Sequence, residues 1–267
     1  MMTLEILLSA MDLADVSYID SLNVTTDAVV INQCDREAYK RLTRRSVRKS
    51  DQTVIYVETK ERGLSKSRNR AMDEADSDIC IFCDNDVEYV EGYDELIKSA
   101  FKAHEDADII VFYIKRKEKP EPNYPHEKRM GYLSVLKIFS PEIAYRREAM
   151  DDIRFDERFG AGSGRYLMGE ENIFLHKALK KKKKIYYVPV KIAELREEES
   201  SWFKGYNEAF FISRGAGYAV MSGLMSPLLI LQFAIRKRSL YRESMSTKRA
   251  LTLMFRGRRE IIGGSAK

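Results

Sequence analysis

Two aspartates end an apolar run in the first third of the chain, where residues 78–90 read "DICIFCDNDVEYV". Asp84 and Asp86 are separated only by Asn85, so an extended or turning backbone can aim both carboxylates at one hard cation such as Mg²⁺ or Mn²⁺. The same spelling also fits an acidic turn that caps the following helix. These residue types alone leave both interpretations open.

A basic segment lies just upstream, with the sequence "ERGLSKSRNRAM" over residues 61–72. Gly63 opens a helix there, and the N–H groups and dipole of a helix start favour a bound anion. Four polar side chains surround this start: Arg62, Lys66, Arg68 and Asn69. We expect a nucleotide diphosphate to bind here, beside the two aspartates. A basic surface helix paired with the acids at 73–76 is the structural alternative.

A glycine-rich loop precedes a second acidic pair far downstream, in "FGAGSGRYLMGEENIFLHKAL" at 159–179. The glycines make the loop pliant, and Glu170 and Glu171 start the helix that follows Gly169. Carboxylates in a first helical turn commonly stabilise the helix dipole. In an enzyme, one of the two would instead act as a general base.

Short apolar runs alternate with helix-like stretches and so predict the elements that must position these side chains. The runs are nearly continuous, which is typical of strands buried on both faces of a parallel sheet. They cover residues 5–9, 28–32, 53–58, 79–83, 108–114, 143–145 and 185–190. Helical patterns cover 64–75, 92–104, 146–150 and 172–179, and a charged surface loop covers 115–131. The pattern predicts an α/β domain with Asp84 and Asp86 at a strand's carboxyl end, where open parallel sheets bind ligands.

The composition indicates one main domain with an appendage in a reducing compartment. The three cysteines are an odd number, which argues against a disulfide framework. Cys80 and Cys83 stand three apart in a predicted strand, point to opposite faces and are expected to be core residues. The N-terminal residues carry Glu5 and Asp12 and have no basic region, so they do not predict a signal peptide. A cytoplasmic location follows.

An uncharged stretch of nineteen residues, 217–235, leads into a strongly basic end. Ser, Gly, Pro and Gln within it argue against a transmembrane helix. Residues 236–267 carry ten Lys and Arg against two Glu, a net charge of +8 that leaves −3 for the rest. This order predicts a segment at 217–260 that lies on an anionic membrane surface. A helix pair packed on the catalytic domain is the alternative.

These motifs together resemble glycosyltransferase family 2, of GT-A fold, and in particular the small bacterial members that build capsular or exopolysaccharide repeat units on a lipid carrier. The resemblance covers nearly the whole chain. It is carried by "GLSKSRNRAM" (63–72), "CDNDV" (83–87), "GAGSGRYLMGEENIFL" (160–175), "KKIYYVPV" (183–190), "SSWFKGYNE" (200–208) and "LTLMFRGRREI" (251–261). The resemblance implies a mixed, mainly parallel sheet flanked by helices.

The resemblance also implies a domain organisation. A catalytic domain would cover 1–205, with a nucleotide-sugar half over about 1–115 and an acceptor half over about 130–205. A helical extension, first apolar and then basic, would cover 206–267 and associate with the membrane.

Each candidate residue receives a role from the resemblance. The residues implied to bind the nucleotide sugar are Ser9, Gln33, Asp35, Arg62, Arg68, Asn69 and Asp84. Asp86 would bind Mn²⁺ or Mg²⁺ directly, and Asp84 would contact the ribose or reach the metal indirectly. Glu171 would take the proton from the acceptor hydroxyl, with Glu170 in reserve.

Two departures from the family pattern affect these roles. The family usually carries Asp where this chain has Glu171. Because Glu is longer by one methylene, the backbone must lie slightly farther from the acceptor hydroxyl if Glu171 is the base; otherwise Glu170 is the candidate. Some members have a His after the strand at 185–190, whereas this chain offers Arg196 for charge stabilisation. Trp202 is expected on the acceptor side.

The implied reaction is an inverting transfer of a sugar from a nucleoside-diphosphate sugar, with UDP favoured, to a lipid-linked saccharide at the inner face of the cell membrane. A nucleotidyltransferase acting on a sugar phosphate would use the same metal and release pyrophosphate. A nucleic-acid-binding protein would use the basic end alone and leave both acidic pairs without a role. We therefore expect no nucleic-acid partner, and the sequence is compatible with an oligomer.

Overall fold

The computed structural model describes residues 2–47, 50–117, 119–196, 203 and 205–264 of the chain. They form two compact units, which we call the sheet unit and the helical unit. The sheet unit comprises Met1–Arg62, Lys66–Arg154 and Ala178–Glu198. The helical unit comprises Gly63–Ser65, Phe155–Lys177 and Glu199–Lys267. The domain boundary predicted at residue 205 stays a prediction.

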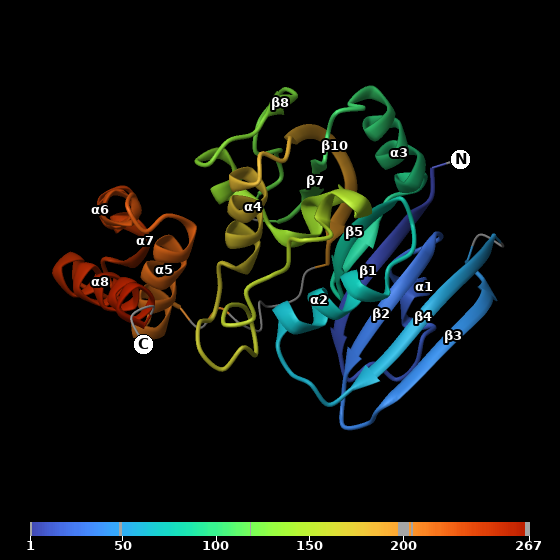
Figure 1. The fold of residues 1–267 in the computed structure, drawn as a ribbon, viewed down its shortest axis with the longest axis horizontal. Coiled ribbons are helices and arrows are strands. Elements are labelled where there is room, and N and C mark those ends of the chain that lie inside the picture. Colours follow the sequence, from blue (N-terminus) through green and yellow to red (C-terminus); the bar gives the residue numbers. More distant parts are fainter. Residues whose placement is uncertain (1, 48–49, 118, 197–202, 204, 265–267) are drawn as a thin grey trace. The chain divides into compact units, whose positions relative to one another are not determined.

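The sheet unit is built on one sheet, which has ten strands among the described residues (Figure 1). The strands are β1 Leu4–Met11, β2 Asp27–Gln33, β3 Ala38–Arg45, β4 Asp51–Thr59, β5 Ile79–Asp84, β6 Val87–Tyr89, β7 Ile109–Lys115, β8 Lys128–Arg129, β9 Ile143–Arg146 and β10 Ile185–Leu195. Their order is β3-β4-β2-β1-β5-β9-β7-β10-β6, and β8 pairs with β10. All strands predicted from apolar runs are present.

The strands at the centre of the sheet, whose ends carry the candidate site residues, mostly pair in parallel. β4, β2, β1 and β5 pair in parallel, as do β7 and β10, whereas β9 lies antiparallel between β5 and β7. β3 and β6 are antiparallel edge strands. The predicted α/β architecture with a mainly parallel sheet is therefore confirmed. β3 escaped prediction because its sequence, "AYKRLTRR", is polar and largely exposed, as edge strands often are.

The helices and short 3₁₀ turns complete the fold. They are α1 Tyr18–Ser21, α2 Leu64–Glu74, α3 Tyr93–Ala103, η1 Ser134–Lys137, η2 Ser140–Glu142, η3 Arg147–Met150, α4 Glu170–Lys180, α5 Glu208–Met221, α6 Ser226–Arg236, α7 Arg238–Tyr241 and α8 Thr247–Gly264. The helices predicted near 64–75, 92–104 and 172–179 correspond to α2, α3 and α4. The loop predicted at 115–131 contains β8.

The core of the sheet unit lies on both faces of its central strands. Every residue of β1 except Met11 is buried, because helices and loops cover the sheet from both sides. Cys80 and Cys83 are free and fully buried in β5, as predicted. Burial raises the pKa of both thiols, so they remain protonated and unreactive.

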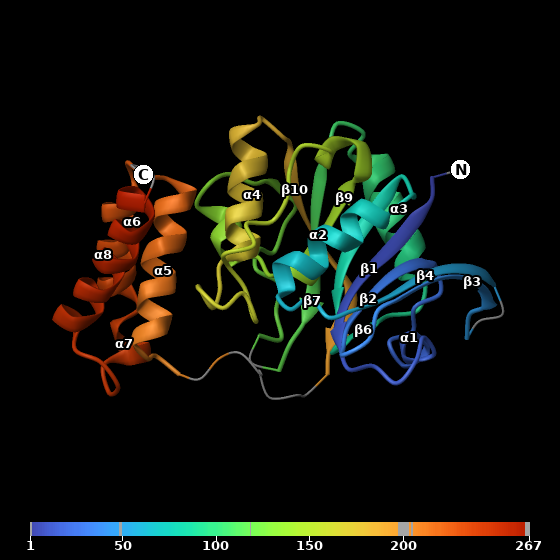
Figure 2. The same ribbon diagram turned by 60° about the horizontal axis from the view of Figure 1, so that its bottom comes forward.

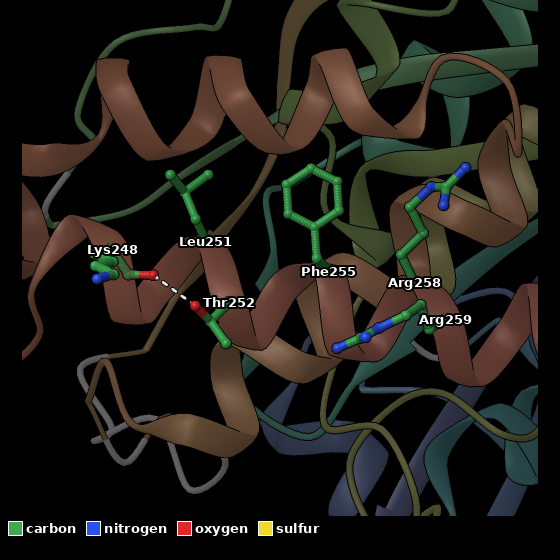
Figure 3. Close-up of a pocket in the computed structure, with 6 residues that line it drawn as sticks. All are labelled: Lys248, Leu251, Thr252, Phe255, Arg258 and Arg259. Atoms are coloured by element: carbon green, nitrogen blue, oxygen red, sulfur yellow. Dashed lines mark hydrogen bonds between the residues drawn. The ribbon is translucent and has the colours of Figure 1, made fainter.

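The helical unit packs α5, α6 and α8 side by side (Figure 2). A Cβ on Gly215 would lie 1.9 Å from the Met254 carbonyl oxygen, and one on Gly257 would lie 2.0 Å from that of Ile212. The backbones of α5 and α8 therefore touch, and only glycine fits at these two positions. The other side of α8 lines a shallow hollow of about 700 Å³ (Figure 3).

The uncharged stretch at 217–235 is divided between two helices. Gly217 lies within α5, which ends at Met221, and α6 begins at Ser226. Among the described residues, no helix is both long and apolar enough to cross a bilayer.

Candidate active site

The carboxyl ends of β1 and β5 carry a polar cluster fastened to α2. Ser9 of β1 lies in register with Asp84 of β5. From α2, the Ser67 hydroxyl donates to the Ser9 hydroxyl at 2.9 Å, and Arg68 Nη2 donates to both Asp84 oxygens at 2.8 and 3.2 Å. Because Ser67 and Arg68 are consecutive, one turn of α2 fixes side chains on two neighbouring strands.

The ion pair between Arg68 and Asp84 is largely removed from solvent. The Arg68 side chain is 2% exposed and the Asp84 side chain 22%. Charge-assisted hydrogen bonds of this kind are stronger than neutral ones and hold the carboxylate in one orientation. The charge on Asp84 is therefore already balanced by protein, and the guanidinium predicted to line a diphosphate is directed at Asp84.

The turn between β5 and β6 is held at its backbone from two sides. The Tyr18 hydroxyl donates to the carbonyl oxygen of Asn85 at 2.9 Å, and the Arg196 N–H donates to that of Asp86 at 2.8 Å. Val87, the first residue of β6, pairs with Leu195 at the end of β10. The position of the Asp86 backbone is thus set by α1 and the end of β10 as well as by β5 and β6, which flank the turn.

The residues of this turn have the chemistry of a divalent cation site. Carboxylate oxygens are the donors that Mg²⁺ and Mn²⁺ prefer, and Mg²⁺ commonly takes one or two protein carboxylates together with substrate phosphates. Asp86 is half-buried and its Oδ1 atom is buried. Among the described residues, no group of three or more His, Cys, Asp and Glu is placed to hold a metal ion. Asp84 and Asp86 fit a site that substrate phosphates would complete.

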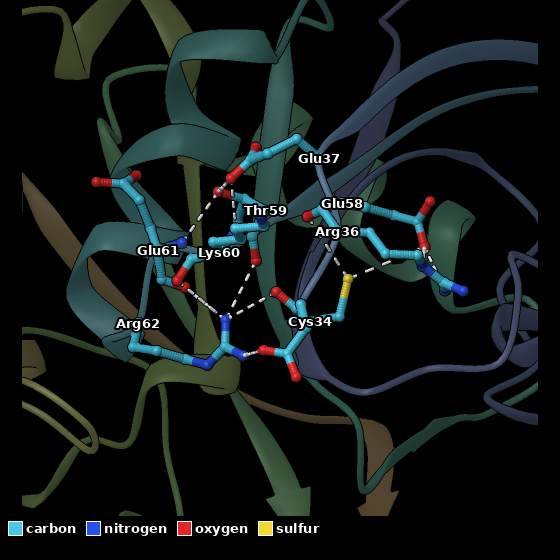
Figure 4. Close-up of polar contacts among 9 residues, drawn as sticks. Cys34, Arg36, Glu37, Glu58, Thr59, Lys60, Glu61 and Arg62 are labelled. Carbon is cyan, nitrogen blue, oxygen red and sulfur yellow. Dashed lines mark hydrogen bonds and ion pairs between the residues drawn. The ribbon is translucent and has the colours of Figure 1, made fainter.

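The ends of β2 and β4 are joined by Arg62 (Figure 4). Its Nη1 donates to the carbonyl oxygens of Cys34 at 2.9 Å and Lys60 at 3.0 Å, and its Nη2 donates to the Asp35 carboxylate at 2.8 Å. Gln33, buried at the end of β2, lies in register with Met11 of β1 and Thr59 of β4. Arg62 therefore ties together the two loops that were predicted to border the nucleotide.

A second set of contacts in Figure 4 reinforces these loops. Arg36 donates to Glu58 Oε1 from Nη2 at 2.6 Å and from Nε at 3.1 Å. Glu37 Oε1 accepts the Lys60 N–H at 2.7 Å. The end of the loop between β2 and β3 is consequently attached to β4 at Glu58 and to Lys60 just after β4.

Asn32 and Ser67 are positioning residues that the sequence did not reveal. Asn32 is fully buried, exchanges hydrogen bonds with the backbone of Leu13 at 2.9 and 3.1 Å, and donates to the Tyr56 hydroxyl at 2.9 Å. It thereby fixes the loop after β1. An amide within the apolar run of β2 was the available signal, because a buried amide needs partners.

In the helical unit, the glycine-rich loop holds the start of α2. The Leu64 N–H donates to the Ala161 carbonyl at 2.8 Å, and the Ser65 hydroxyl donates to the Phe159 carbonyl at 2.6 Å. A Cβ on Gly162 would lie 3.3 Å from Gly63, so the two segments approach closely. One N–H group of this helix start is therefore used by the protein, and the predicted anion site there stays a prediction.

Glu170 and Glu171 form the first turn of α4 and differ in their surroundings. Glu170 is 7% exposed, and a Cβ on Gly160 would lie 3.2 Å from its carboxyl carbon. Gly160 has φ +104°, a conformation that favours glycine. Glu171 is only half-buried. Glu170 therefore packs on the glycine-rich loop, while Glu171 is the more accessible of the two.

Asn69, Arg196 and Trp202 are the predicted residues that remain. Asn69 is buried on α2. Arg196 Nε donates to Glu88 Oε2 at 3.3 Å, and its Nη2 donates to the Ser21 carbonyl. Its guanidinium thus joins β10 to β6 and α1. Trp202 lies outside the described residues.

A family model described as "Glycosyl transferase family 2" matches residues 22–170, more than half of the chain. The chain belongs to glycosyl transferase family 2. The matched region contains the ends of β2, β4 and β5 with Asp84 and Asp86, and it extends to Glu170. This family 2 chain is therefore a glycosyltransferase, which sets aside the nucleotidyltransferase and nucleic-acid-binding alternatives.

Solved structures show the same fold. TarS 1-349 of S. aureus has a TM-score of 0.62 and 14% identity, over 98% of this chain and 83% of that chain. The same protein in complex with UDP-GlcNAc gives 0.63 at 14% identity over the same shares, and in complex with UDP 0.61 at 13%, again over 98% and 83%. No curated protein matches this chain. At these identities the likeness supports a GT-A-like fold for this family 2 glycosyltransferase.

Proposed function

We propose that this glycosyltransferase transfers a sugar from a UDP-sugar to a lipid-linked saccharide during synthesis of a capsular or exopolysaccharide. The observation that carries the proposal is the polar edge of the sheet, where Arg68 fixes Asp84 two residues before Asp86. Family 2 membership supplies the reaction class. The fold likeness to TarS solved with UDP-GlcNAc and with UDP supports the nucleotide.

The donor would bind along the carboxyl ends of β1, β2, β4 and β5. We assign the nucleotide to the edge that carries Ser9, Gln33 and Asp35, which Arg62 and Asn32 hold in place. Asp84, oriented by Arg68, is suited to accept hydrogen bonds from ribose hydroxyls. Its balanced charge makes it a weaker candidate than Asp86 for direct contact with a cation.

Asp86 would hold a Mn²⁺ or Mg²⁺ ion, with Asp84 beside it. When bound, such an ion balances the negative charge that develops on the departing diphosphate. The Tyr18 hydroxyl and the Arg196 N–H donate to the carbonyl oxygens of Asn85 and Asp86, and so hold the backbone that carries the Asp86 side chain.

Glu171 is our candidate for the base that accepts the proton of the attacking hydroxyl. The hydroxyl oxygen forms a bond to the anomeric carbon while the bond from that carbon to the diphosphate oxygen breaks, and attack from the opposite face inverts the configuration. A carboxylate base removes the charge that would otherwise build on the attacking oxygen. Glu171 is favoured over Glu170 because Glu170 packs against Gly160.

Arg196 and Trp202 also receive proposed roles. Arg196 would stabilise negative charge, although its guanidinium contacts Glu88 and the Ser21 carbonyl. Trp202 would contact the acceptor. The proposed location is the cytoplasmic face of the cell membrane, where a saccharide on a lipid carrier would be met.

A screen of UDP-sugars for Mn²⁺-dependent binding and slow hydrolysis tests the donor site. We expect Asp86→Asn to weaken Mn²⁺-dependent binding of the best donor at least about tenfold, because a metal ligand is lost. Asp151→Asn, at an exposed aspartate of the same unit, is the matched control. Donor binding that is equal in the native chain and Asp86→Asn would remove Asp86 from the metal role.

The base is tested by comparing Glu171→Gln with Glu170→Gln. Loss of a general base costs about 10²–10⁴-fold in rate, so we expect Glu171→Gln to lose transfer by that factor and keep donor binding. Release of UDP and of the product anomer would be followed by chromatography and NMR. An active Glu171→Gln chain together with an inactive Glu170→Gln chain would reassign the base.

A further inference from the structure

Helix α6 is apolar on both of its faces. One face is buried in the helical unit and comprises Ser226, Leu229, Ile230 and Ala234. On the opposite face Leu228, Leu231 and Ile235 are 58%, 43% and 71% exposed, and Leu224 in the preceding turn is 89% exposed. We call these four residues the outer stripe. A surface helix normally turns polar side chains outward, and exposed apolar patches of this kind are typical of surfaces that bind a protein or a membrane.

Cations follow the outer stripe directly. Arg236 ends α6, Lys237 and Arg238 come next, and Arg242 follows α7. All four side chains belong to exposed residues, and none forms an ion pair with another described residue. We call them the basic cluster. Leu240, between them, is 52% exposed, so the apolar surface continues into the cluster.

The hollow on α8 repeats this combination in the same unit (Figure 3). It is lined by Lys248, Leu251, Thr252, Phe255, Arg258 and Arg259. Arg258 Nε donates to the Ser226 hydroxyl at 2.9 Å, and its Nη2 donates to the Gly223 carbonyl at 3.4 Å. Arg258 thereby fixes the turn that carries Leu224 at the start of the outer stripe.

We propose that the outer stripe and the basic cluster bind the surface of an anionic lipid bilayer. The outer stripe enters the interface with α6 parallel to the membrane plane, and the basic cluster contacts lipid phosphates and other acidic headgroups. Each Lys or Arg near such a surface contributes about 1 kcal/mol, or roughly fivefold in partitioning. The biological purpose rests on the proposed function, because a lipid-linked acceptor would be reached there.

The same observations decide against two other arrangements. α6 has 11 residues, which at 1.5 Å per residue is about half of the ~30 Å hydrocarbon core, so α6 lies on a bilayer and does not cross it. A second copy of the chain would bring a like-charged basic cluster toward the first, which opposes association. An anionic surface complements both the charge and the apolar side chains.

The direct test is sedimentation of the full chain with vesicles of phosphatidylcholine, with and without phosphatidylglycerol. The native chain should pellet with the anionic vesicles at low salt and be released as salt rises, since exposed charges are screened. A native chain that stays in the supernatant with anionic vesicles at low salt overturns the proposal, whatever the variants do.

The outer stripe is tested by Leu228→Ser combined with Ile235→Ser. Removing two large apolar side chains should weaken partitioning into anionic vesicles on the order of a hundredfold. Leu133→Ser is the matched control, because Leu133 is 66% exposed in the sheet unit, and it should bind vesicles like the native chain. Equal binding by the double variant and the native chain overturns the proposal.

The basic cluster is tested by Lys237→Gln combined with Arg238→Gln. Loss of two charges should weaken binding to anionic vesicles roughly thirtyfold and leave binding to neutral vesicles unchanged. Lys40→Gln with Arg45→Gln, at exposed positions of β3, is the control. A twofold or smaller loss in the test pair overturns the electrostatic part of the proposal.

Two further readouts separate this surface from the donor site and from self-association. Circular dichroism establishes that the variants are folded, and UDP binding in the same preparations should be unchanged by the serine pair, while Asp86→Asn should still bind vesicles. Vesicle binding by a chain that binds no UDP-sugar would refute the proposed function and support this surface. A halved mass by light scattering for the serine pair, with native vesicle binding, would assign the stripe to a second copy and overturn the proposal.

Discussion

Different kinds of contact stabilise two regions of the molecule: the carboxyl edge of the sheet in the sheet unit, and the packed helices α5, α6 and α8 in the helical unit. At the sheet edge, polar side chains form hydrogen bonds with one another. Arg68 donates to Asp84, Ser67 donates to Ser9, and Arg62 joins the loops after β2 and β4. In the helical unit, backbone surfaces of α5 and α8 touch at Gly215 and Gly257. The contacts in the first region orient functional groups, whereas the packing in the second region depends on the close fit of the α5 and α8 backbones.

This difference has a physical reason. Hydrogen bonds and ion pairs are directional, so they can fix a carboxylate against a substrate that carries charge. Apolar packing has little direction but responds steeply to volume. We therefore expect the sheet unit to respond to changes of charge, and the helical unit to respond to added atoms.

The largest effect on stability should come from Gly257→Ala. The new methyl carbon would lie 2.0 Å from the Ile212 carbonyl oxygen, so α5 and α8 must separate. Overpacking of this kind costs up to about 3 kcal/mol of unfolding free energy, which urea unfolding followed by circular dichroism would measure.

Gly263→Ala, on the same helix, is the matched control. A Cβ there meets nothing within 4 Å, and alanine is the better helix former by up to about 1 kcal/mol. The two substitutions should therefore change stability in opposite directions. Equal effects would show that the close contact of α5 and α8 does not limit the stability of the helical unit.

A smaller effect on stability should come from a change of pH, through ionisation of the buried Glu142 in the sheet unit. Desolvation raises its pKa from 4.5 to about 7 despite Arg116 at 3.5 Å. Because the folded-state pKa is the higher one, the contribution to stability is complete below pH 4.5 and is lost as the pH rises to about 7. The native chain should lose on the order of 2 kcal/mol between pH 5 and 7 from this group.

Glu142→Gln should remove that dependence, since glutamine can still accept the Phe139 N–H that now bonds to Glu142 at 3.1 Å. Urea unfolding at several pH values would give the slope for both chains. A steep fall in stability that persists in Glu142→Gln would assign the titration to another group.

The smallest effects should come from replacing Arg62 or Arg36, two arginines in the loops of Figure 4. Only the replacement of Arg62 should weaken UDP-sugar binding. Arg62 is 37% exposed and serves several carbonyl oxygens besides Asp35, so Arg62→Gln should cost about 1 kcal/mol and weaken UDP-sugar binding. Arg36 is 64% exposed, whereas its partner Glu58 is 9% exposed, and we expect Arg36→Gln to cost on the order of 1 kcal/mol without weakening UDP-sugar binding. If Arg36→Gln weakened binding as much as Arg62→Gln, the linking role of Arg62 would be refuted.

The alternation of buried strands with helices was legible in the sequence because fully buried strands must be apolar throughout. For the same reason the acidic pair at the end of β5 stood out. The antiparallel β3 and β9 were harder to place: β3 is a polar edge strand, and the position of β9 between β5 and β7 depends on pairings distant in sequence. Local pattern does not encode which strands become neighbours.

The sequence alone determined the chemistry available to this protein: the acidic pair Asp84 and Asp86, the acids Glu170 and Glu171, and an apolar stretch followed by cations. Tertiary structure decided how these groups are used. It paired Asp84 with Arg68, packed Glu170 on Gly160, and turned one face of α6 outward. Residue type fixes charge and hydrophobicity, but the neighbours that balance a charge or cover an apolar face come from distant parts of the chain, and only folding brings them together.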